Sequence, residues 1–187
     1  GISRESLLLT NNIFLTTACI VVFLGTLLPM IHKELGLGSI SIGEPFFNQM
    51  FTYLIIPTVF FMGVGPLSRW RQQPASQLQN KLLLAFVFSV TMGLLVPYLM
   101  EGGANALVAL GASLTFWIFI TTIQEIQLRS GNKQGFFKGL SKLSGSHWGM
   151  VFGHVGIAVM IMGITLVENY TEERHLRMQP GQSYTIY

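Results

Sequence analysis

Hydrophobic residues in this chain gather into five long stretches, and polar linkers separate one stretch from the next. An α-helix needs about 20 apolar residues to cross a bilayer core of about 30 Å, and each stretch has close to that length. The pattern predicts an all-α fold, a polytopic membrane helix bundle, with residues 1–187 as a single transmembrane domain. The five predicted spans lie near Ile13 to Ile31, Phe47 to Leu67, Leu82 to Met100, Ala104 to Ile126 and Trp148 to Val167.

Composition supports a membrane protein independently of the pattern. Hydrophobic residues make up 50% of the chain and charged residues only 10%, a balance that soluble domains of this size do not show. The single cysteine, Cys19, excludes a disulfide framework and a CxxC pair. The first apolar stretch is too long for the core of a signal peptide and lacks a suitable cleavage site, so we interpret it as an uncleaved span.

The positive charges divide unevenly between alternate linkers. By the positive-inside rule, the linkers that carry more Lys and Arg lie in the cytoplasm. We therefore expect a cytoplasmic N-terminus and a periplasmic C-terminus, and anchoring to membrane lipid explains the net charge of +3 without a nucleic-acid partner. The cytoplasmic group is Arg4, Arg69, Arg71, Lys81, Arg129, Lys133, Lys138 and Lys142, and the outer group is Lys33, Arg174 and Arg177.

Three constellations have an ordinary structural explanation. We interpret His32, Lys33 and Glu34 as solvated charges in an outer loop at a helix end. The following segment, GLGSISIG, fits a loop, but it lacks the lysine and the complete glycine pattern of a phosphate-binding motif. Glu125 lies four residues before Arg129, which favours a surface ion pair over the alternative of a proton relay.

The last span, HWGMVFGHVGIAVMIMGITL, places His154 well inside an apolar run. An ionisable residue within a membrane is costly and indicates function, and a neutral imidazole is a good ligand for haem iron. A buried hydrogen-bonding role is the alternative, and composition and spacing leave both open. His147 is seven residues away, about 10 Å along a helix, so the two rings cannot bind the same iron. We interpret His147 and Trp148 as an interfacial pair at the helix start.

Glycines recur along the same span at helical spacing. Gly149, Gly153, Gly156 and Gly163 share one stripe, a pattern that lets another helix or a flat ligand approach closely. Packing of another helix is the favoured interpretation. Gly153 and Gly156, close to His154 in sequence, are the candidates for contact with a ligand.

The stretches GTLLPMIHKELGLGSISIGEPFFNQMF and SHWGMVFGHVGIAVMIMGI, followed by ENYTEER, resemble the CcmF/NrfE haem lyase family of cytochrome c maturation. The resemblance runs over the whole chain, and it is to a portion of the C-terminal half of a longer protein. The family's tryptophan-rich haem-handling motif is missing, because Trp70, Trp117 and Trp148 are isolated. An upstream pair of haem-ligating histidines and a soluble outer domain are missing too.

The resemblance implies a function in cytochrome c biogenesis at the bacterial inner membrane. It implies that His154 is an axial ligand of haem iron, of the haem b type, while the thiols of an apocytochrome c CxxCH site add to the haem vinyl groups. The partners that it implies are the rest of the CcmF-like protein, a haem chaperone, thiol-handling maturation proteins and apocytochrome c. The chain alone is not expected to be an active haem lyase.

Two alternatives remain open at this point. In the first alternative the chain is a transporter subunit, and in the second it is a scaffold with no haem ligand of its own. The proline-containing spans favour the first, although no inverted repeat of the kind that transporters show is present.

Overall fold

A computed structural model of the chain describes residues 4–68, 75–101, 104–130 and 143–170. Five of the helices in these ranges are long and apolar enough to cross a membrane, which confirms the predicted all-α membrane fold. The elements are α1 (Arg4–Glu34), α2 (Glu44–Val64), the short 3₁₀ helix η1 (Gly65–Leu67), α3 (Ala75–Glu101), α4 (Ala106–Ser130) and α6 (Gly145–Tyr170).

The helices run past the apolar stretches from which they were predicted. His32, Lys33 and Glu34 form the last turn of α1, so their assignment to a loop was wrong. Similarly, α4 continues through Arg129 to Ser130. Helical hydrogen bonds satisfy the backbone within the segment itself, so a spanning helix continues favourably beyond the apolar core, into the polar boundary.

The end of α1 explains why a glycine-rich segment follows it. Gly36 has a φ of +70°, the left-handed conformation that favours glycine. Its N–H donates to the carbonyl of Lys33 at 3.1 Å, and the N–H of Leu37 donates to the carbonyl of His32 at 3.2 Å. This pair of bonds is a Schellman motif, which stops the helix and starts the predicted loop before Glu44.

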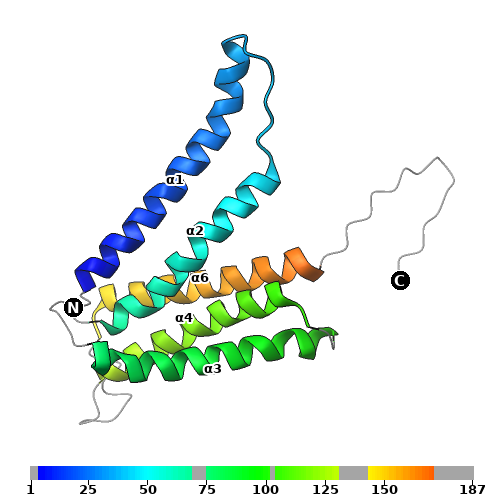
Figure 1. The fold of residues 1–187 in the computed structure, drawn as a ribbon. Coiled ribbons are helices and arrows are strands. Elements are labelled where there is room, and N and C mark those ends of the chain that lie inside the picture. Colours follow the sequence, from blue (N-terminus) through cyan, green and yellow to red (C-terminus); the bar gives the residue numbers. More distant parts are fainter. Residues whose placement is uncertain (1–3, 69–74, 102–103, 131–142, 171–187) are drawn as a thin grey trace.

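Helix α4 is the centre of the bundle. Half of its apolar window (50%) is buried, against 6% for α1. It contacts α2, α3 and α6, and in Figure 1 it runs beside α3 and α6. Helices α1 and α2 form a hairpin that rises away from these three, with its closed end farthest from them (Figure 1).

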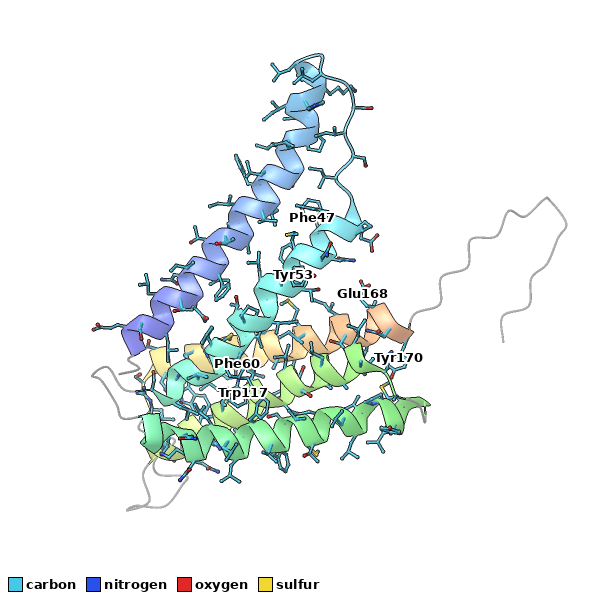
Figure 2. All side chains as sticks on the ribbon, viewed as in Figure 1. Phe47, Tyr53, Phe60, Trp117, Glu168 and Tyr170 are labelled. Carbon is cyan, nitrogen blue, oxygen red and sulfur yellow. The ribbon has the colours of Figure 1, made fainter. Side chains whose placement is uncertain are left out.

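Besides Gly25 of α1, which lies against the Phe47 ring of α2, small residues bring the helices close at three places. A Cβ atom added at Gly63 would meet the Trp117 indole, and one added at Gly111 would meet the Thr165 side chain. The third place is Gly93 of α3, which lies against the backbone of Ser113 in α4. Close approach of this kind is a main source of attraction between helices in a membrane, where burial of apolar surface gives little. Figure 2 shows Trp117 and Phe60 together where α2 crosses α4.

Much of the predicted charge pattern lies outside the described residues. The positions concerned are Arg69, Arg71, Lys133, Lys138, Lys142, Arg174 and Arg177. Trp70, one of the isolated tryptophans, lies outside the described residues as well. The orientation of the chain in the membrane therefore stays a prediction.

Candidate functional site

The face of α6 that packs on α4 can be read from burial. His147, Val151, Ala158 and Ile161 are the buried residues of α6, at intervals of four, seven and three. These intervals follow one stripe of a helix, and the position missing from the series, three residues after Val151, is His154. His154 therefore lies on the stripe that faces the bundle, and it is partly buried there.

The imidazole of His154 has a defined orientation. Its Nδ1 lies 2.8 Å from the carbonyl oxygen of Met150, one turn earlier in α6. A carbonyl oxygen only accepts hydrogen bonds, so Nδ1 carries the proton and donates it. In the neutral ring the lone pair is then on Nε2. This arrangement, with one ring nitrogen held by a backbone carbonyl and the other available, is typical of histidine ligands to metals.

His154 lies farther from the start of its helix than the sequence indicated. It is nine residues from the first residue of α6, Gly145, which corresponds to about 14 Å along the helix axis. The apolar stretch alone indicated about 10 Å, because α6 begins before His147. Within the described ranges, no three His, Cys, Asp or Glu residues gather to form a metal site from this chain alone.

His147 is buried against the bundle, which its interpretation as an interfacial residue did not indicate, and its depth in the membrane stays a prediction. Its exposed fraction is 7%, and its Nε2 lies 3.2 Å from Oε2 of Glu125 on α4. The approach lacks the alignment of a hydrogen bond, and within the described part of the chain neither atom has a hydrogen-bond partner. We therefore treat the contact as an electrostatic one between two buried polar groups.

Glu125 also differs from expectation. Its predicted ion pair with Arg129 is present, through Nε and Oε1, but Glu125 is only 1% exposed and the pair is not on the surface. The Arg129 side chain is 47% exposed, so only the acid is buried. The acid lies on the central helix where α6 begins, and α6 covers it. A carboxylate inside the predicted span, which ends at Ile126, is the signal that could have indicated this.

The glycine stripe of α6 lies on a different face. At about 100° per residue, Gly153 is about 100° and Gly156 about 160° from His154, in the same direction around the helix. A Cβ atom added at Gly149, Gly153, Gly156 or Gly163 would meet nothing within 4 Å in the described part of the chain. The helix packing expected on this stripe is therefore not provided by the described residues.

Other candidate residues lie apart from this region. His32 is partly exposed at the end of α1, where its Nδ1 lies 2.9 Å from the carbonyl of Gly38. An open groove between α1 and α2 is almost entirely apolar and contains no histidine; Cys19 and Thr26 are its only residues with polar side-chain atoms. Thr26 already donates to the carbonyl of Val22 at 2.7 Å. His154 is therefore the described histidine that is best placed to bind a ligand within the membrane.

Comparisons with known proteins give curated relatives over the whole chain. The chain is 48% identical over 187 residues to the cytochrome c-type biogenesis protein CcmF of Escherichia coli (strain K12), with 99% of the chain aligned. It is 44% identical over 184 residues to CcmF of Haemophilus influenzae, and 25% identical over 189 residues to NrfE of the same species. It spans 28% of the length of each of these relatives.

No family model matches the chain, and no solved structure matches it. The resemblance seen in the sequence is nevertheless confirmed by the curated relatives. The chain is similar over nearly its full length to one portion of the longer proteins of the CcmF/NrfE family.

Proposed function

We propose that this chain is the part of a cytochrome c biogenesis protein in which His154 supplies an axial ligand to haem iron. The observation that carries the proposal is the orientation of His154 on the α4-facing stripe of an apolar helix: Nδ1 donates to Met150, and Nε2 has no hydrogen-bond partner among the described residues. The names of the relatives support the general role in cytochrome c biogenesis.

The residues of this chain hold and orient the ligand. The Met150 carbonyl fixes the tautomer and limits rotation of the ring, and the packing of α6 on α4 limits movement of the helix. Bound haem supplies the vinyl carbons that react with the cysteine thiols of an apocytochrome c, so the chain contributes orientation and iron ligation.

Gly153 and Gly156 remain candidates for contact with the haem. They lie on the side of α6 that no described residue covers, whereas His154 lies on the side that faces α4. A haem bound to His154 would therefore reach these glycines only with an edge that extends around α6. The rest of the longer protein, a haem chaperone, thiol-handling proteins and apocytochrome c are the partners that the proposal requires.

The orientation in the inner membrane is part of the proposal. The uneven division of Lys and Arg places the N-terminus in the cytoplasm and the C-terminus in the periplasm. The test uses single cysteines in a Cys19→Ser background and an impermeant thiol reagent. A cysteine at exposed Asn80 should react only from the cytoplasm, and one at exposed Ser39 only from the periplasm.

The ligand is tested by His154→Ala in the full-length protein. We expect the variant to lose the absorption spectrum of its ligated haem and to mature little cytochrome c. Added imidazole should restore part of both, because it can occupy the vacant axial position. His32→Ala is the matched control, since His32 lies at the end of α1, away from α6, and its loss should leave the haem spectrum unchanged. A normal haem spectrum in His154→Ala would favour the scaffold or transporter alternative.

A further inference from the structure

A buried acid and a buried imidazole join α4 to α6 near the start of α6. The side chains of Glu125 and His147 are 2% and 5% exposed, and their facing atoms Oε2 and Nε2 are 3.2 Å apart. The other carboxylate oxygen of Glu125 is held by Arg129. No part of the haem-ligand site described above uses this pair, because His147 is two turns away from His154.

The contact is one of three polar links along the antiparallel pair of helices. At the middle, the Thr115 hydroxyl donates to the carbonyl of Ala158 at 3.3 Å. At the far end, the Asn105 amide donates to Asn169 at 3.4 Å. The described residues form no other hydrogen bond or ion pair between α4 and the segment of α6 from His147 to Ala158.

His154 lies within that segment. Its rotation about the α6 axis and its depth therefore depend on the links at the two ends, at His147 and at Ala158. The link at His147 involves a buried carboxylate in an interior of low dielectric, where electrostatic contacts are strong, and the loss of Glu125 leaves the buried His147 ring unpaired. The link at Ala158 is a single long hydrogen bond to a neutral hydroxyl.

We propose that Glu125, acting through His147, is a positioning residue for His154. The buried pair holds the first turns of α6 against α4, and this fixes where the free Nε2 of His154 points. The inference rests on the proposed role of His154 as a haem ligand. It assigns a function to two residues that lie outside the ligand site itself.

The test uses Glu125→Gln, His147→Gln and the double variant in the full-length protein. Glutamine keeps the size of Glu125 and removes its charge. We expect haem to dissociate at least fivefold faster from each single variant, the lower end of ordinary coupling between sites. The double variant should be no worse than the worse single variant, because both changes break the same contact.

Imidazole rescue and a matched control separate a positioning role from a general loss of stability. Added imidazole should restore the haem spectrum of Glu125→Gln while the amount of folded protein stays constant. Gln124→Ala is the matched control, because Gln124 donates to the backbone of Lys81 on α3 and not to α6. This control should leave haem dissociation unchanged.

A third readout does not depend on haem. A cysteine at buried Val151, in a Cys19→Ser background, should react faster with a membrane-permeant maleimide when Glu125 is Gln. Unchanged labelling would show that the pair does not hold α6 and would overturn the proposal. Faster labelling with unchanged haem dissociation would also overturn it, because α6 would then move without affecting the ligand. A normal spectrum in His154→Ala, by contrast, is the separate result that rejects the ligand role.

Discussion

The indole Nε1 of Trp117 on α4 donates a hydrogen bond to the backbone carbonyl of Phe60 on α2, at 3.0 Å. The two aromatic rings are stacked with their centroids 5.2 Å apart and their planes 4° from parallel. Trp117 is only 3% exposed, so the donor is satisfied inside the bundle rather than at a membrane interface. The absence of a side chain at Gly63, one turn of α2 further on, gives the indole its space. This contact attaches the α1–α2 hairpin to the central helix.

Gly63→Ala should therefore destabilise the protein. The added methyl group would clash with the Trp117 ring, and we expect a loss of about 1–3 kcal/mol, the usual cost of overpacking. The measurement is the thermal stability of the purified protein in detergent. Gly65→Ala is the matched control, because a Cβ atom at Gly65 meets nothing within 4 Å and its φ of −51° suits alanine. Equal stability of the two variants would contradict the packing described for Trp117.

Gly111 and Thr165 offer a test by compensation. A Cβ atom at Gly111 would meet the hydroxyl and methyl groups of Thr165, so Gly111→Ala should separate α4 from α6 and lower the thermal stability. Adding Thr165→Ala removes those groups, and the double variant should regain most of the lost stability. Additive destabilisation by the two changes would show that the helices do not meet at this point.

The fold was predictable from the sequence because a bilayer leaves few choices. Apolar stretches of spanning length can satisfy their backbone groups only as helices or closed barrels, so the five spans follow from hydropathy. The helix ends were less predictable, since His32 and Arg129 continue their helices beyond the apolar core. Hydropathy contains no information about where such polar turns stop.

The candidate site was only partly predictable. His154 could be selected because one histidine inside an apolar run is conspicuous in any sequence. The burial of Glu125 and His147 could not be predicted, because it requires the antiparallel register of α4 and α6, and that register depends on contacts across the whole interface. The glycine stripe was visible, but periodicity alone does not tell which neighbour a helical face meets. In the structure, close contacts form at Gly63 and Gly111 instead.

The open glycine face of α6 leads to a prediction about the full-length protein. Gly153 lies outside the stripe that packs on α4, and no described residue lies within 4 Å of a Cβ atom placed there. The chain spans only 28% of its curated relatives, so a helix of the remaining protein or the edge of the haem can cover this face. We expect Gly153→Leu to be poorly tolerated in the full-length protein, because a leucine side chain would push either neighbour away.

Two measurements show which neighbour covers Gly153. A fall in the amount of folded protein indicates helix packing, whereas loss of haem at a normal protein level indicates contact with the macrocycle. Phe152→Leu is a suitable control, because this side chain is 68% exposed and the change keeps it apolar. If Gly153→Leu accumulated normally and retained its haem, the stripe would face lipid, and the candidate role of Gly153 and Gly156 in haem binding would be wrong.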